Sequence, residues 1–149
     1  MPNMWNLREY STGWAAMNGH KEVVEALLGR EDIDPDKAGY KGRTPLMWAV
    51  CNRNQGILEI LLRREDIDPN KLDEHGQTPL LQAIENGHSG AVEMLLRRDD
   101  INPSKPNTDG ETPLCVAADY GQVEVVRMLL EIGGVNPNKP DGESEIPLS

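Results

Sequence analysis

Histidine recurs at one place in the sequence, directly after a glycine, as His20 and His88. A histidine side chain can transfer protons near neutral pH or bind a metal ion. At the matching positions of other segments the chain has Asn54 and Gln122, and an amide cannot act as a base. Proton transfer therefore does not recur at this position. We interpret the two histidines as turn residues that hydrogen-bond nearby backbone.

Acidic pairs also recur, at residues 31–32, 65–66 and 99–100. A calcium loop places its oxygen ligands at alternating positions, an order that adjacent carboxylates lack. Their repetition favours local capping and turn formation over a metal site. The two cysteines, Cys51 and Cys115, have no neighbouring histidine to activate a thiol. We therefore predict no catalytic residue, no metal site and no cofactor.

Composition narrows the class of protein further. The chain has 149 residues, enough for one domain, with 15 Lys and Arg against 25 Asp and Glu, a net charge of −10. A chain this acidic repels phosphate, which argues against nucleic acids and anionic membranes as partners. No run approaches the roughly 18 apolar residues of a membrane span, and no secretory-signal pattern is visible. We expect a cytoplasmic protein, with the nucleus as the alternative.

The elements that hold these residues follow from an internal repeat of 34 residues. Thr-Pro-Leu stands at 44–46, 78–80 and 112–114, and Ile-Pro-Leu follows at 146–148. The same spacing relates three further rows: Ile33, Ile67, Ile101 and Val135; Pro35, Pro69, Pro103 and Pro137; and Lys37, Lys71, Lys105 and Lys139. Units in register without insertions predict a layered structure, in which each segment buries little.

Each unit predicts two short helices. Threonine supplies a side-chain oxygen that caps the first helix, and proline suits its first position. This helix, for example residues 45–52, ends at a glycine such as Gly87, because glycine adopts positive φ without a Cβ penalty. Arg53 holds that place in the second unit, so we expect a turn there that is strained or differently built. The second helix has apolar residues at helical spacing, such as Ile57, Leu58, Leu61 and Leu62.

A polar finger follows each second helix, for example residues 67–76, and ends in a turn. Helices of this length do not persist alone in water. Stability must therefore come from stacking, in which each helix pair covers the apolar face of the next.

These motifs resemble ankyrin repeats: Thr-Pro-Leu, the alanines Ala49, Ala83 and Ala117, the Gly-His pairs, and Asp-Ile-Asn at 100–102. The resemblance covers residues 14–148. The finger sequence is similar to arrays of filamentous fungi, often attached to nucleotide-binding immune-receptor-like proteins. The resemblance implies an all-α solenoid of about four helix-turn-helix units with short β-hairpin fingers. The implied units are 1–43, a degenerate first repeat, then 44–77, 78–111 and 112–145, with the start of a truncated unit at 146–149.

The sequence departs from the family pattern after Thr-Pro-Leu, where the family usually has a histidine. Met47, Leu81 and Cys115 occupy that place, so we expect apolar packing instead of a polar network. At the other end, residues 146–148 keep the helix-start register. This register favours a segment of a longer array over a last finger that serves as the C-terminal cap. We expect the chain to be a monomer or part of a longer chain.

Positions that vary between units are free to serve recognition, whereas packing positions recur. In ankyrin-like stacks the finger tips and first helices line a concave groove, which implies partner-binding residues there. On the finger tips these are Tyr40, Lys41, Arg43, Glu74, His75, Gln77, Thr108, Asp109 and Glu111. On the first helices they are Trp14, Asn18, Trp48, Asn52, Gln82, Asn86 and Tyr120.

Trp14 and Trp48 occupy equal positions in adjacent units, and two interpretations remain open. Both rings lie exposed side by side in the groove, a composition typical of binding hot spots, or both are half-buried between stacked helices. Charge is uneven as well, because residues 35–68 carry a net charge of +1 inside an acidic array. A basic step at Lys41, Arg43 and Arg53 would orient an acidic partner segment.

We therefore expect a non-enzymatic protein–protein interaction module that binds a protein partner through its concave face. A rigid stack loses little entropy on binding, so contacts convert efficiently into affinity. Three alternatives stay open. They are a sensor or regulatory segment of a larger fungal immune-receptor-like protein, a structural spacer, and a groove for a small molecule or catalysis around Trp14, Trp48 and Tyr120.

Overall fold

The computed structural model describes residues 7–132, which form eight α-helices and no β-strand. The helices are α1 (Leu7–Met17), α2 (Lys21–Leu28), α3 (Pro45–Cys51), α4 (Gln55–Leu62), α5 (Pro79–Glu85), α6 (Ser89–Leu96), α7 (Pro113–Asp119) and α8 (Val123–Glu131). A short 3₁₀ turn, η1 (Tyr40–Gly42), lies between α2 and α3.

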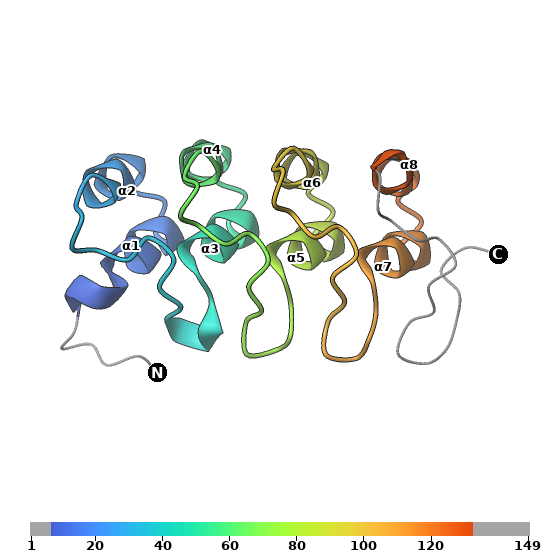
Figure 1. Ribbon diagram of the computed structural model, residues 1–149, viewed down its shortest axis with the longest axis horizontal. Coiled ribbons are helices and arrows are strands. Elements are labelled where there is room, and N and C mark those ends of the chain that lie inside the picture. The colour runs from blue at the N-terminus through green and yellow to red at the C-terminus, as the bar shows by residue number, and fades with distance from the viewer. Residues whose placement is uncertain (1–6, 133–149) are drawn as a thin grey trace.

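The helices form two parallel rows (Figure 1). The first helices α1, α3, α5 and α7 make one row, and the second helices α2, α4, α6 and α8 make the other. The connecting fingers project from the first row on the side away from the second helices. This confirms the predicted all-α repeat solenoid. The predicted limits of the outer units, at residues 1–6 and 133–149, lie outside the described part of the chain.

The first helices begin and end as the repeat predicts. The hydroxyl of Thr44 accepts a hydrogen bond from the backbone N–H of Met47 at 3.3 Å, and Thr78 and Thr112 cap α5 and α7 in the same way. The sulfur of Met47 accepts in return from the backbone N–H of Thr44 at 3.5 Å. Met47 is fully buried, so the residue in the family's histidine position both packs and closes the cap.

The turn after each first helix has positive φ. Gly19, Gly87 and Gly121 have φ of +75°, +66° and +68°. Arg53 takes the same conformation with φ of +55°, which confirms the expected strain, because left-handed backbone costs a side-chain-bearing residue about 1–2 kcal/mol. The guanidinium of Arg53 donates to the backbone oxygen of Asn86, which holds the strained turn against the next unit.

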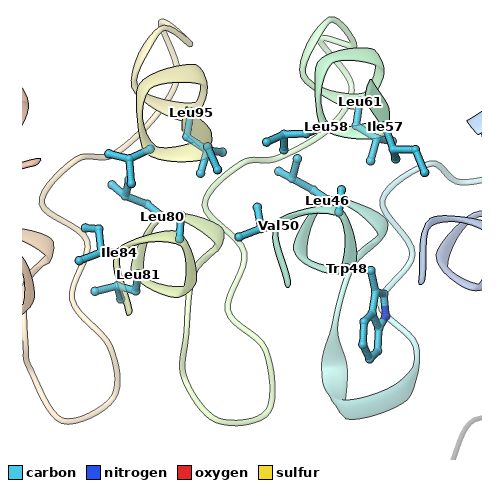
Figure 2. Packing of buried hydrophobic residues seen from close by; sticks show 14 of the residues in the cluster. Leu46, Trp48, Val50, Ile57, Leu58, Leu61, Leu80, Leu81, Ile84 and Leu95 are labelled. Carbon is cyan, nitrogen blue, oxygen red and sulfur yellow. The ribbon is translucent and has the colours of Figure 1, made fainter. Parts of the chain in front are cut away.

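One continuous apolar core runs through the stack (Figure 2). Leu46 on α3 points towards Leu58 on α4, whereas Val50 points from α3 towards the neighbouring unit that contains α5, and Leu80 and Ile84 repeat this arrangement one unit on. Each such leucine contributes about 1.5–3 kcal/mol by leaving water. Small residues let neighbouring first helices approach closely, and Ala16, Ala49, Ala83 and Ala117 are fully buried. The core therefore lies between units as much as within them.

The fingers are not the short β-hairpins that the resemblance implied. In finger 1 (residues 39–43), finger 2 (73–77) and finger 3 (107–111), one backbone hydrogen bond joins the first residue to the last. In finger 2 the carboxylate of Asp73 accepts from the backbone N–H groups of His75 and Gln77. The side-chain oxygen of Asn107 accepts in the same way in finger 3, whereas finger 1 closes through the 3₁₀ turn η1, and no strand forms in the described fingers.

Two arginines spaced by 34 residues tie the second and third units to the unit before each. Arg64 donates to the backbone oxygen of Leu28 at 2.6 Å, and Arg98 donates to those of Leu62, Arg64 and Ile67 at 2.8–3.0 Å. The carbonyls at a helix C-terminus have no partner within the helix, so these guanidinium groups supply it. Asp66 and Asp100 orient the two guanidinium groups by paired hydrogen bonds. We call Arg64 and Arg98 the arginine clamps.

Candidate partner-binding groove

The fingers and the first helices form the surface that carries the predicted binding residues, and we call this surface the groove. A pocket of about 460 Å³ lies in it between fingers 1 and 2 and helices α3 and α5. Its walls are formed by Arg43, Cys51, Asp73, His75, Gln77, Gln82, Glu85 and Asn86. Most of these residues belong to the predicted set, so the structure brings the finger and helix positions together.

An aromatic and cationic cluster forms one end of the groove. The rings of Tyr40 and Trp48 stack nearly parallel, with an interplanar angle of 3° and centroids 6.3 Å apart. The guanidinium of Arg43 lies 4.9 Å from the Trp48 ring centroid, and the ammonium of Lys41 lies 5.4 Å from that of Tyr40. Such cation–π contacts hold the positive charges in place at this end.

The two tryptophans differ in exposure. Trp48 is only 9% exposed and belongs to the core, so the interpretation with two exposed tryptophans is wrong. Trp14 is half-buried and lines a small hollow with Tyr10 and Tyr40. That hollow has a volume of about 10 Å³, which is room for one water molecule at most. Tyr40 is the ring of this cluster that reaches the surface.

Gln82 was predicted as a contact residue, but the structure buries it to 5% exposure. Its amide donates to the carboxylate of Asp73 at 2.8 Å, and its carbonyl oxygen lies 3.5 Å from the sulfur of Cys51. The Asp73 carboxylate also lies 3.7 Å from Arg43 Nε. Gln82 therefore stabilises finger 2 against α5 and does not face a partner.

The opposite part of the groove is acidic. The carboxylate of Glu85 accepts from the amide of Gln77 at 3.3 Å. Partial burial raises the pKa of Glu85, and the nearby charges of Glu111 and Asp73 act in the same direction. Glu111 also accepts from the amide of Asn107 within finger 3. Negative charge is therefore concentrated on fingers 2 and 3 and on α5.

Sequence reasoning missed the row formed by Cys51, Glu85 and Asp119, which are spaced by 34 residues at the ends of α3, α5 and α7. The signal was present, since this row lies three residues after the row of Trp48 and thus on the same helix face. Burial raises the pKa of the Cys51 thiol, so Cys51 remains protonated and unreactive.

The remaining predicted residues are at least partly open to solvent, and several also join units. Asn52 donates to the backbone oxygen of Met17, and the amide of Asn18 to that of Trp14. Thr108 packs so closely on finger 2 that a Cβ at Gly76 would lie 2.4 Å from its oxygen. Tyr120 is the most open aromatic residue of the set, at 54% exposure. The other open residues are Glu74, His75, Asn86 and Asp109.

The histidines at the turns behave differently from each other. His88 accepts from the backbone N–H of Ala91 through Nδ1 at 3.4 Å, which confirms the structural interpretation. His20 makes no such cap. Within residues 7–132, no group of three or more His, Cys, Asp or Glu is arranged to hold a metal ion. No helix in the same range is long and apolar enough to cross a membrane.

Comparison with known proteins agrees with the geometry. The family model for ankyrin repeats (3 copies) matches residues 9–73 and 56–141. No curated protein matches the chain. Ankyrin repeats are generally protein–protein interaction modules and are typically non-catalytic. Helix pairs in 34-residue register, capped by Thr-Pro and joined by polar fingers, together with this match, show that the chain belongs to the ankyrin repeat family.

Proposed function

We propose that this chain is a non-enzymatic module that binds a protein partner through the groove. The observation that carries the proposal is that packing positions and groove positions vary differently from unit to unit. Residues that pack between units recur every 34 residues and are buried, whereas residues that face the groove differ from unit to unit. A surface that varies on a scaffold that repeats is free to be selected for one target.

The scaffold also suits tight recognition. The fingers are closed by hydrogen bonds, and the arginine clamps join neighbouring units. Little conformational freedom is lost when a partner enters a surface that is already ordered, so contacts convert efficiently into affinity. Tyr40 and Tyr120 supply exposed aromatic rings towards the two ends of the groove, and tyrosine is enriched among interface hot spots.

The test is affinity purification from the native source with three forms of the chain. The groove variant carries Tyr40→Ala and Tyr120→Ala, and the control carries Arg63→Ala and Arg97→Ala on the exposed side of α4 and α6. We expect the wild type and the control to capture one protein that the groove variant loses. The reason is that loss of the two rings weakens the free energy of binding by about 2 kcal/mol or more. Equal capture by all three forms would contradict the proposal.

The finer context belongs to the same proposal. We place the module in the cytoplasm or nucleus, as a regulatory segment of a larger fungal immune-receptor-like protein. The resemblance of its fingers to those arrays supports this. Reading the coding sequence on both sides tests it, since a nucleotide-binding motif in the same frame is the expected result.

A further inference from the structure

The charge of the groove changes in order along the stack. Three rows of residues spaced by 34 positions run through it, and each row is more negative at its α7 end than at its α3 end. The rows are Lys41, His75 and Asp109; Arg43, Gln77 and Glu111; and Cys51, Glu85 and Asp119. The first two rows are the matching positions of fingers 1, 2 and 3, which stand side by side in Figure 1. The third row lies at the ends of α3, α5 and α7.

Charges elsewhere on the surface are arranged differently. Along the second helices and the loops after them, five arginines pair with an acidic residue two to four positions away. These pairs are Arg30–Asp32, Arg64–Asp66, Arg97–Glu93, Arg98–Asp100 and Arg127–Glu124, with nitrogen–oxygen distances of 2.6–2.9 Å. These pairs bring opposite charges together within one unit, so they give that side no direction along the stack.

The charges at the two ends of the groove are separated by whole units, and the ion pair of Arg43 with Asp73 joins the neighbouring fingers 1 and 2. Within residues 7–132, the side chains of Lys41, Asp109 and Asp119 have no ion-pair partner. Lys41 rests on the Tyr40 ring, while Asp109 and Asp119 are exposed to solvent. As far as the described residues go, these side chains are open to charges that a partner supplies.

Resting on the proposed function, we propose that the groove binds an extended segment of a protein with a fixed order of charge. Acidic side chains of that segment lie over finger 1, beside Lys41 and Arg43. Its lysines or arginines lie over finger 3 and the end of α7, beside Asp109 and Asp119. Opposite charges then meet along the whole groove, which sets both the register and the direction of the segment.

The spacing of the units sets the spacing of the partner's charges. Neighbouring packed helices lie about 8–10 Å apart, so two steps along the stack span roughly 16–20 Å. An extended chain advances about 3.3 Å per residue. The acidic and basic side chains of the bound segment are therefore about five to six residues apart. A segment of one sign, positive or negative, is repelled at one end of the groove.

The test is selection of binders from a displayed library of random 12-residue peptides at low salt, with the full chain as bait. We expect the enriched peptides to carry acidic and basic residues about five to six positions apart. For such a peptide, interchanging the charges so that signs alternate weakens binding about tenfold, since each exposed pair contributes little and several act together. Enriched peptides without this pattern would overturn the inference.

Two charge-reversed baits make the test sharper. Asp109→Lys with Asp119→Lys reverses the exposed charges at finger 3 and the end of α7, so this bait enriches peptides that carry acidic residues where the wild type selects basic ones. Lys41→Glu reverses the exposed charge at finger 1, so this bait enriches peptides that have lost the acidic residues selected there by the wild type. The control bait, Arg63→Glu with Arg97→Glu, changes exposed residues outside the groove and enriches the same peptides as the wild type. Circular dichroism melts of all baits verify that each is folded.

The outcomes separate this inference from the proposed function. Peptides that lack the charge pattern but are lost with Tyr40→Ala contradict the inference and leave groove binding in place. Charge-reversed baits that enrich the wild-type peptides also contradict the inference. A library from which no peptide is enriched contradicts the inference, whereas the affinity purification decides the proposed function.

Discussion

At the scale of single residues, the groove depends on side chains that do not face it. Trp48 is in the core, and both Tyr40 and Arg43 rest on its ring system. Gln82 and Asp73 hold finger 2 in the same indirect way. Sequence position alone placed Trp48 and Gln82 on the correct helix face. It could not tell which of them is covered, because the covering groups come from fingers that precede each helix.

Trp48→Ala tests this supporting role. Because the ring is buried, we expect the free energy of unfolding to fall by about 3–5 kcal/mol. The matched change Tyr40→Ala removes a ring that is 36% exposed and should cost clearly less. Urea denaturation of both variants gives the comparison. A Trp48→Ala variant as stable as the wild type would show that the ring is not part of the core.

Asp36 is a buried carboxylate whose charge has a cost. It is 5% exposed, and its Oδ2 accepts from the backbone N–H of Asp68 and from Lys71, while Oδ1 has no hydrogen-bond partner among the described residues. Desolvation by burial raises its pKa above the ordinary 3.8. The folded state therefore binds this proton more tightly than the unfolded state. The protonated form of Asp36 thus stabilises the folded state. This contribution to the free energy of unfolding is fully present below pH 3.8 and is lost as the pH rises through the raised pKa of Asp36.

Asp36→Asn should therefore stabilise the protein near neutral pH, by about 1 kcal/mol. The next unit shows the arrangement that the amide would copy. There Asn70 donates to the backbone oxygen of Asp100 and accepts from the N–H of Asn102. Urea denaturation at several pH values checks the sign, because the advantage of the variant should shrink as pH falls towards 4. An advantage that grows in acid would contradict the assignment.

At the scale of elements, the helices could be predicted from the sequence because their signals are local. The Thr-Pro caps, the glycine turns and the apolar spacing each act within one turn of helix. The strain at Arg53 could be predicted because the matching positions of the other units have glycine. The arginine clamps could not be predicted in this way. Their acceptors are backbone carbonyls of another unit, and no residue type marks a carbonyl.

The clamps give a test at this scale, because Arg97 and Arg98 are neighbours with different tasks. Arg98→Ala leaves three backbone oxygens without their donor and should lower the free energy of unfolding by about 2–3 kcal/mol. Arg97→Ala breaks only an exposed pair with Glu93 and should change it by less than about 0.5 kcal/mol. Thermal and urea denaturation measure both. Equal losses in the two variants would argue against the clamp.

At the scale of the whole molecule, the net charge of −10 acts on a thin stack with a large surface. Its like charges repel one another in the folded state more than in the expanded chain. Added sodium chloride screens this repulsion, so we expect the Tm to rise by about 2–4 °C between low and physiological salt. This rise corresponds to a gain of ~1 kcal/mol in the free energy of unfolding. Calorimetry at matched pH checks the direction. A Tm that falls with salt would mean that the surface ion pairs outweigh the repulsion.

The arginine clamps also have a consequence for how such a chain lengthens. Each clamp reaches back by one unit, from a donor in one 34-residue block to acceptors in the block before it. Tandem duplication of one interior block copies donor and acceptor together, so the new joint is complete without any further change. Each inserted copy would also bring its own finger to the groove, where later substitutions can alter the target without disturbing the joint.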